Sequence, residues 1–368
     1  MQTISVLYGG GTISSVATQD GYRTADGSID LLGLLGTHRP HSTELLSHLN
    51  LLTPITVYRG LSENIDLMYN RLIAEQIKDI VSEQSPTGIL LSFGTDSMLL
   101  MARWLAAELG EILAQKGICL ILTGANEDTA HADTDAWDNL MLALSSFGTL
   151  EPGVFIAFGG AVIAAANAVM EPFDGTAMRF ADSRSDEYAA KINACSIRRQ
   201  AQIDCFGSMG ETGREGQVLL YAVNQTDILD FGTLYASVEM LSAKIVIFVL
   251  YHSGTANTAS AVSSVALLTE ELRLMGVTCF GAAENGEPVT LNAYSTSVEL
   301  RRAGMVPLYD MDYQVALAKA RYMLQIGVHP SEYIAAMYTP CCAEIDPQLI
   351  NIEHKEELIQ LYNPALEA

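Results

Sequence analysis

Two short stretches place a threonine hydroxyl where a predicted strand ends in a turn. The first is Gly9-Gly10-Gly11-Thr12, directly after the apolar, β-branched run 3–8. The second is Phe93-Gly94-Thr95-Asp96, after another apolar run and before a helical pattern. A threonine hydroxyl is a weak nucleophile that needs a base or a charged neighbour. Because open α/β sheets bind ligands at the carboxyl ends of their parallel strands, we expect chemistry at Thr95 and Asp96.

Each stretch also has a purely structural explanation. Glycines after a first strand let the backbone approach a ligand and present amides to an anion. The turn lacks the Gly-x-Gly-x-x-Gly spacing of dinucleotide sites, and no lysine follows as in a nucleotide P-loop. A glycine turn alone is structural more often than functional. Asp96 could simply cap the helix that follows it.

Two further motifs remain ambiguous by themselves. Thr123-Gly124-Ala125 ends a predicted strand, and Asp135 follows twelve positions after Thr123. This pattern is typical of an active-site rim and also of an ordinary capped helix. His252-Ser253 places a histidine beside a serine, but no matched acid stands out for a catalytic triad. A substrate contact or a plain turn is the better interpretation of that pair.

The elements that must position these residues alternate between strand and helix. Periodicity predicts strands and helices in a βαβ rhythm, which favours right-handed crossovers and a mostly parallel sheet with helices on both faces. The polar segment 14–31 is predicted to be a long loop of the kind that often forms a lid. The expected strands are 3–8, 55–58, 89–91, 118–122 and 154–158, with helices at 66–81, 98–113 and 135–145.

The chain changes character between residues 182 and 217, which are polar and end in a glycine-rich run. We therefore predict an N-terminal domain at 1–205, a linker at 206–216 and a smaller C-terminal α/β domain at 217–368. In the latter we expect strands at 217–223, 244–250 and 277–281, and helices at 256–274, 297–303, 313–325 and 352–361.

Bulk properties exclude several classes of function. The 368 residues include 43 acidic and 20 basic side chains, for a net charge of −23. Such a field repels phosphate backbones and anionic lipid, so we expect neither a nucleic-acid nor a membrane partner. No apolar run reaches spanning length, and residues 1–8 indicate a strand rather than a signal peptide. The six cysteines lack metal-ligand spacing, which favours reduced thiols in a cytoplasmic protein without a metal site.

In order and spacing, the three motifs resemble the L-asparaginase/glutaminase family. That family has a Gly-Gly-Thr-Ile turn, found here at 10–13, a Gly-Thr-Asp stretch, found at 94–96, and Thr-Gly-Ala with an aspartate twelve residues on. Tyr22 falls where the family carries a lid tyrosine, and Ser62-Glu63 where it holds the substrate α-carboxylate. Residues 294–296 resemble the small-domain signature. The resemblance covers most of residues 2–326.

The resemblance implies a two-domain α/β amidohydrolase, a homodimer or homotetramer, that acts on a small amino-acid-like substrate without metal or organic cofactor. Thr12 would be the nucleophile with Tyr22 assisting it, Thr95 the second catalytic threonine, and Asp96 the group that binds the α-ammonium. Amides of the glycine turn and of Thr95 would form the oxyanion hole. The implied substrate-binding residues are Gly11, Ser62, Glu63, Gly94, Thr123 and Ala125.

Three positions depart from the family pattern. Glu171 stands where the family has a lysine that activates its second threonine, Phe93 replaces a histidine, and Glu63 replaces a glutamine-like residue. Arg179 or Lys191 could supply the missing cation.

Three hypotheses follow from these departures. Glu171 could act as a general base. The added acids could suit a more cationic substrate, or one that lacks a free α-carboxylate. Alternatively, the fold could have lost catalysis and become a metabolite-binding or regulatory module. We favour hydrolysis of a carboxamide or related C–N bond with altered specificity.

Overall fold

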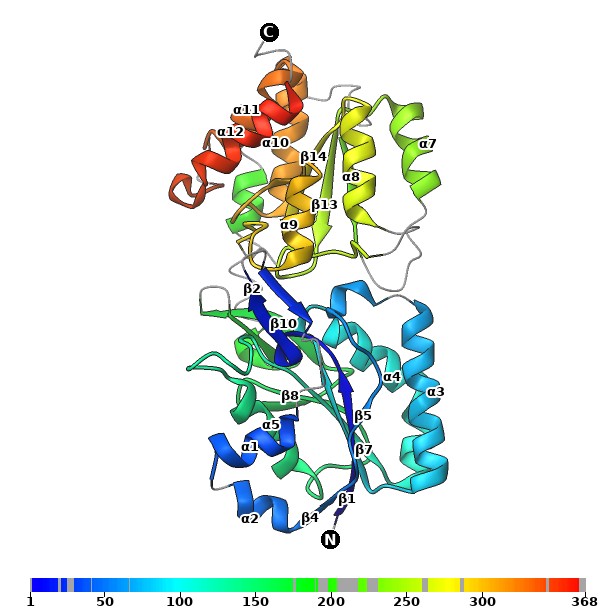
Figure 1. Cartoon of the computed structure of the whole chain (residues 1–368). Coiled ribbons are helices and arrows are strands. Elements are labelled where there is room, and N and C mark those ends of the chain that lie inside the picture. Colours follow the sequence, from blue (N-terminus) through cyan, green and yellow to red (C-terminus); the bar gives the residue numbers. More distant parts are fainter. Residues whose placement is uncertain are drawn as a thin grey trace. The chain divides into compact units, whose positions relative to one another are not determined.

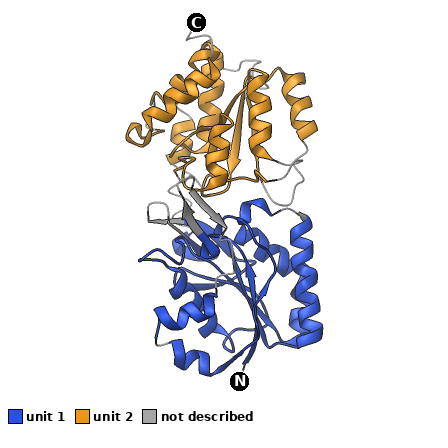
Figure 2. Ribbon diagram, in the orientation of Figure 1, with its two compact units in different colours: residues 1–188 blue, residues 189–368 orange. Residues whose placement is uncertain are grey.

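A computed structural model of the chain describes residues 2–18, 21–24, 30–40, 42–65, 67–174, 177–188, 190, 198–203, 218–223, 231–259, 264–284, 288–341 and 344–363, without the side chains of 16–24, 67 and 172–178. The chain divides into two compact units, Met1–Tyr188 and Ala189–Ala368 (Figure 2). The predicted linker 206–216 lies outside the described residues and stays a prediction. None of the described helices is both long and apolar enough to cross a membrane.

Unit 1 is built on a seven-stranded sheet whose pairs are all parallel except the last, β8 with β9. β1 lies near the middle, with β4 and β5 on one side and β6 on the other. The order β4-β1-β6-β7-β8-β9 confirms the predicted α/β class. The strands are β1 (Gln2–Gly9), β4 (Leu49–Leu51), β5 (Ile55–Thr56), β6 (Gly88–Phe93), β7 (Cys119–Thr123), β8 (Gly153–Phe158) and β9 (Ala161–Ala164).

Helices cover both faces of this sheet because its central strands are apolar on both sides. Leu91 and Phe93 of β6 join a core with helices α3 (Leu67–Gln84) and α4 (Thr95–Lys116). Leu90 points to the opposite core, which contains α1 and α5. Figure 1 shows these helices on the two sides of the sheet. The second layer comprises α1 (Leu31–His38), α2 (Ser42–Ser47) and α5 (Ala136–Ser146).

One crossover in unit 1 contradicts the expectation of right-handed connections throughout. The steps from β6 to β7 and from β7 to β8 run in the same direction across the sheet. Their helices, α4 and α5, nevertheless pack on opposite faces, so the two crossovers have opposite hands. The connection through α3 shares the hand of α4, as does the reverse step from β1 to β4. The crossover through α5 is the exception to the right-handed rule.

Two antiparallel hairpins accompany the sheet. β2 (Ser15–Thr18) pairs with β3 (Gly21–Thr24), so the predicted loop 14–31 is wrong over that part. The sequence there has no apolar alternation, which is why the hairpin was not foreseen. β10 (Ala168–Asp174) pairs with β11 (Ala177–Asp182), and Arg103 of α4 donates a hydrogen bond of 2.7 Å to the carbonyl of Ala168. This second hairpin is therefore anchored to α4.

Unit 2 contains a four-stranded parallel sheet in sequential order, with β12 (Val218–Ala222), β13 (Ile245–Leu250), β14 (Thr278–Ala283) and β15 (Val306–Pro307). Ile245 and Ile247 pack with α10, whereas α8 contacts β14. Ser264 caps α8, accepting a hydrogen bond from the amide of Leu267, so the helix predicted from 256 begins at 265. The helices are α7 (Phe231–Leu241), α8 (Val265–Leu274), α9 (Ser295–Arg302), α10 (Tyr313–Gln325), α11 (Tyr333–Tyr338) and α12 (Ile352–Tyr362).

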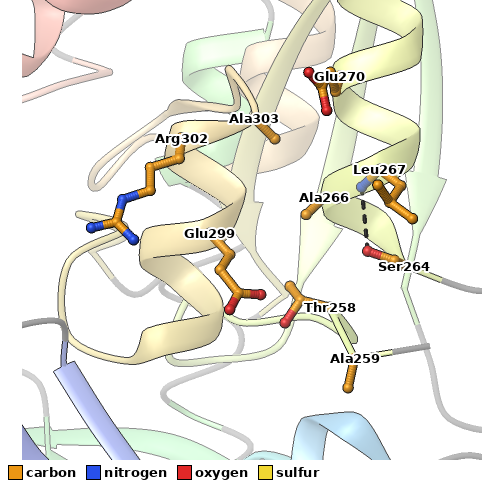
Figure 3. A pocket seen from close by; sticks show the side chains of 9 residues that line it. All are labelled: Thr258, Ala259, Ser264, Ala266, Leu267, Glu270, Glu299, Arg302 and Ala303. Carbon is orange, nitrogen blue, oxygen red and sulfur yellow. Dashed lines mark hydrogen bonds between the residues drawn. The ribbon is translucent and has the colours of Figure 1, made fainter. Parts of the chain in front are cut away.

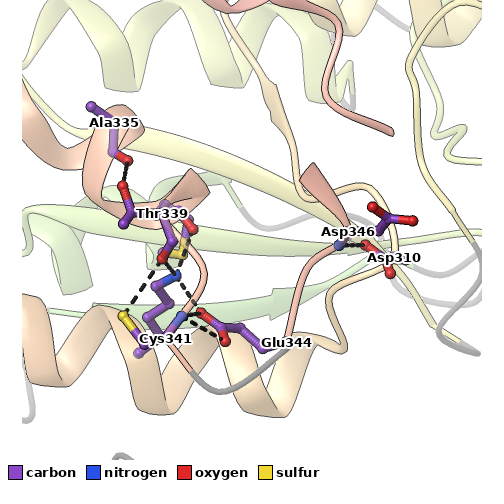
Figure 4. Close-up of polar contacts among 8 residues, drawn as sticks. Asp310, Ala335, Thr339, Cys341, Glu344 and Asp346 are labelled. Carbon is purple, nitrogen blue, oxygen red and sulfur yellow. Dashed lines mark hydrogen bonds and ion pairs between the residues drawn. The ribbon is translucent and has the colours of Figure 1, made fainter. Parts of the chain in front are cut away.

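A buried ion pair fastens the segment after α11 to α10. The ammonium of Lys319, whose side chain is 2% exposed, lies 2.5 Å from a carboxylate oxygen of Glu344. It also donates to the carbonyls of Met337 and Thr339 at 2.8 and 2.7 Å. Glu344 in turn accepts hydrogen bonds from the amide of Cys341 (Figure 4). A buried lysine is tolerated here because all three of its donors have acceptors.

Candidate active site

The two threonines singled out by the sequence follow neighbouring strands. Thr12 opens a 3-10 turn, η1 (Thr12–Ser14), at the carboxyl end of β1. Thr95 is the first residue of α4, at the carboxyl end of β6. β1 and β6 are parallel, with Gly9 opposite Phe93. Both threonines therefore lie at the edge of the sheet where α/β proteins place their ligands.

Glycines bring these two loops into direct backbone contact. Gly11 has a φ of 81°, and a Cβ added to it would fall 2.2 Å from the Cα of Gly94. The hydroxyl of Ser15 donates to the Gly11 carbonyl at 2.8 Å, which holds the turn in place. A side chain at position 11 would push the loop of Thr12 away from that of Thr95.

We expect Gly11→Ala to destabilise unit 1 and to disrupt the site. The positive φ costs about 1–2 kcal/mol for a residue with a Cβ, and forced overpacking adds roughly 1–3 kcal/mol. Chemical denaturation should show this loss, and a matched Gly36→Ala variant should show none because a Cβ there meets nothing within 4 Å. If both variants are equally stable, the backbone contact is not as tight as described.

A third loop joins the same point. The amide of Gly11 donates to the carbonyl of Gly60 at 3.1 Å. Ser62 begins the turn η2 (Ser62–Asn64), and its Oγ lies where a Cβ on Gly94 would be, at 2.2 Å. The Ser97 hydroxyl of α4 donates to the Ser62 carbonyl at 3.0 Å. Because the Gly11 amide is already engaged, the expectation that it contributes to an oxyanion hole is wrong for this conformation.

The start of α4 supplies charge and a donor. Gly94, rather than Asp96, is the N-cap residue, so the capping alternative for Asp96 is wrong. Asp96 lies in the first turn, where the helix dipole stabilises a carboxylate. The amide of Thr95 has no intrahelical acceptor, as for every first-turn amide of a helix. That amide is the better candidate for binding an oxyanion.

The polar side chains of these loops are enclosed. Thr12 and Thr95 are 4% and 3% exposed, and Asp96 is 6% exposed. Ser62 and Glu63 are each 2% exposed. Electrostatic interactions are stronger in such a water-poor environment than at the surface. The structure thus gathers five of the predicted site residues, with Gly11 and Gly94 between them.

The Thr-Gly-Ala loop is adjacent but has a different role. The Thr123 hydroxyl donates to the carbonyl of Ala157 at 2.8 Å, so it stabilises the sheet. Ala125 is buried at 1% exposure. Asp135 accepts hydrogen bonds from the amides of Asn126 and Glu127, at 2.9 and 3.2 Å. This aspartate braces the loop, so the rim and capping interpretations give way to a structural one.

Glu171 has a cationic partner. It lies opposite Arg179 in the β10–β11 hairpin and is 4% exposed. The guanidinium Nε of Arg179 is 2.5 Å from a Glu171 carboxylate oxygen, and this hydrogen bond raises the pKa of Arg179. Met170 and Phe180 face the other way, into the core beside α4. Because a carboxylate hydrogen-bonded to arginine is a weaker base, the pair disfavours Glu171 as general base.

Two predicted contributors cannot be placed from the described residues. The backbone of Tyr22 lies in β3, opposite Ala17, and β3 contacts η1. The Tyr22 side chain and all of Lys191 lie outside the described residues. Their assigned roles stay predictions.

Hollows elsewhere do not involve the predicted residues. One of about 440 Å³ lies between α8 and α9 of unit 2, where Glu299 and Thr258 point toward one another (Figure 3). Another of about 470 Å³ in unit 1 is lined by His38, His131 and Trp137, among others. Neither is lined by any residue predicted to act.

The His252 motif forms a tight turn in unit 2. The amide of Gly254 donates to the carbonyl of Tyr251 at 2.9 Å, and that of Tyr251 to the carbonyl of Thr255 at 3.1 Å. His252 is 3% exposed. These bonds favour the plain-turn interpretation. Within the described part of the chain, no group of three or more histidine, cysteine or acidic side chains could hold a metal ion.

Comparison with known proteins now decides the family. Residues 3–202 match the family described as Asparaginase, N-terminal. The chain belongs to the asparaginase family. The match covers more than half of the chain and includes all the loops that meet at Gly11 and Gly94.

Two similar relatives of this asparaginase-family chain are both named as one and the same subunit of a glutamyl-tRNA(Gln) amidotransferase. That of Methanopyrus kandleri is 27% identical over 155 residues, which is 42% of this chain and only 31% of the relative. That of Methanococcus maripaludis is 24% identical over 347 residues, covering 88% of this chain and 76% of the relative. Among solved structures, the thermostable L-asparaginase from Thermococcus kodakarensis is 18% identical, with a TM-score of 0.41 over 94% of this chain and 99% of that one.

Sequence reasoning missed two contributors to this asparaginase-family site. Ser97 was passed over, although its place three residues after Gly94 puts it on the first turn of α4. The Glu171–Arg179 pair was also not foreseen, because their eight-residue separation matters only once the hairpin register is known. A break of two residues between β10 and β11, a glycine followed by a threonine, was the available signal.

Proposed function

We propose that the chain is an amidohydrolase that cleaves a side-chain carboxamide, or a related C–N bond, of a small amino-acid-like substrate, with a specificity altered from the family pattern. The observation that carries the proposal is the backbone contact between Gly11 and Gly94, which brings two buried threonines to one sheet edge. Family membership supports hydrolysis of linear amides as the reaction class.

In the proposed reaction the Thr12 Oγ attacks the amide carbon and forms a tetrahedral intermediate. The amide of Thr95, at the positive end of α4, stabilises the oxyanion. Collapse expels ammonia and leaves an ester on Thr12, which water then hydrolyses. Thr95 and Tyr22 would relay the proton from Thr12 to the leaving nitrogen, and Asp96 would bind the substrate ammonium.

Ammonia release tests the proposal directly. Purified protein should be assayed against asparagine, glutamine and amide derivatives that lack or block the α-carboxylate. We expect turnover of at least one member of this panel. Absence of turnover for every member, at protein concentrations where folding is verified by thermal unfolding, would refute the hydrolase proposal.

One observation favours a second function, a metabolite-binding or regulatory module. Arg179 neutralises Glu171 at the position where the family has its activating lysine. The curated relatives are named as subunits of an amidotransferase, so a protein partner is a further possibility under this function. A ligand from the same panel that raises the melting temperature without being hydrolysed would support the second function over the first.

The assembly and location belong to the same proposal. A homodimer or homotetramer in the cytoplasm agrees with three free cysteines among the described residues, Cys119, Cys279 and Cys341, and with the acidic net charge. Light scattering of the purified chain would give the number of subunits.

A further inference from the structure

Glu63 is the feature of the candidate site that the proposed reaction does not use. It lies in η2, the turn that contacts the start of α4, and its side chain is 2% exposed. The neighbouring Ser62 packs against Gly94, and Ser97 donates to the Ser62 carbonyl. Glu63 is therefore held in the wall of the site, one residue from a side chain that touches the Thr95 loop.

A second buried carboxylate, Asp96, enters the same site from α4. Two carboxylates near two buried hydroxyls produce a local negative potential, and the net charge of −23 adds to it at long range. An anionic group brought into such an enclosed site is repelled more strongly than in water. A cationic group is attracted, and the hydroxyls of Thr12 and Thr95 remain neutral toward both.

From these charges we infer that Glu63 determines specificity, and that the site takes amides carrying an ammonium but no carboxylate. This inference rests on the proposed function for its reaction. The ammonium would lie between Asp96 and Glu63, and the carboxamide would lie at Thr12. A free α-carboxylate on the same ligand would face Glu63 and weaken binding.

Matched pairs of small amides isolate this effect. Asparagine and 3-aminopropanamide differ only by the α-carboxylate, as do glutamine and 4-aminobutanamide. The wild-type chain should prefer the carboxylate-free member of each pair, in Kd by calorimetry and in kcat/KM for ammonia release. Glu63→Gln keeps the size of the side chain and removes its charge. We expect it to shift the ratio toward asparagine or glutamine by about 100-fold, the scale of a like-charge contact.

Two controls separate this effect from folding and from overall charge. Glu83→Gln removes one negative charge from an exposed position on α3 and should leave the ratio unchanged. Thermal unfolding should show that Glu63→Gln is folded, and Glu63→Ser offers a second variant that also removes the charge. Binding is measured independently of turnover, so the ratio of Kd values tests the inference even if no amide is hydrolysed.

The outcomes are distinct. A preference for the carboxylate-free amides that disappears in both Glu63 variants supports the inference. Turnover with a wild-type preference for asparagine or glutamine, unchanged in either variant, overturns the inference while the hydrolase proposal stands. Binding with the expected preference but without turnover refutes the hydrolase proposal and keeps the assignment of Glu63.

Discussion

Thr12→Ala should reduce ammonia release from the best substrate by at least about 10³-fold, the loss expected when a nucleophile is removed. The change deletes the one hydroxyl of η1 that is enclosed beside Gly94, and no other hydroxyl can take its place without moving the backbone. The measurement is kcat/KM, with thermal unfolding to show that the variant is folded.

Thr12→Ser is the matched variant because it restores the hydroxyl and loses only a methyl group. It should recover most of the activity. Thr95→Ala should also be severely impaired, and the double variant no worse than the weaker single one, since residues that act as a unit are not additive. If Thr12→Ala retains turnover, the nucleophile has been assigned to the wrong residue.

Lys319→Met should lower the free energy of unfolding of unit 2 by about 3–5 kcal/mol, the cost of breaking a buried ion pair by removing one partner. The variant leaves Glu344, which is 3% exposed, without the lysine. The carbonyls of Met337 and Thr339 lose their donor as well. Urea denaturation followed by far-ultraviolet circular dichroism would measure the effect.

The double variant Lys319→Met with Glu344→Leu should recover much of that loss, because an apolar pair of similar volume needs no hydration. A surface control is available in Lys78→Met. Lys78 is 31% exposed and pairs with Glu75 and Glu108, so its removal should cost about 1 kcal/mol or less. Equal effects at Lys319 and Lys78 would contradict the description of a buried pair.

The sequence predicted the parts of this fold that depend on short-range pattern. Apolar runs located β1, β6 and β7 within two residues, and the order of glycine, threonine and aspartate identified the loops that meet. Helix α4 begins at Thr95, three residues before the expected 98, because the polar first turn carries none of the apolar periodicity that marks a helix.

Features that depend on distant residues could not be read in this way. The hand of the crossover through α5 follows from which face the helix covers, and α5 is amphipathic in either case. The hydroxyl of Thr123 is directed to Ala157 of the next strand, a contact set by sheet register. Lys319 was detectable in principle, since it occupies a core-facing position between Ala316 and Ala320 on α10.

The contact of Gly11 with Gly94 has a consequence for how the site can change. Main chain touches main chain there, so the spacing of the two threonines does not depend on any rotamer. Substitutions at surrounding positions such as Glu63 can alter which molecule fits without altering how far apart the reacting hydroxyls are. For directed evolution, the geometry of the chemistry and the choice of substrate are therefore separable variables in this scaffold.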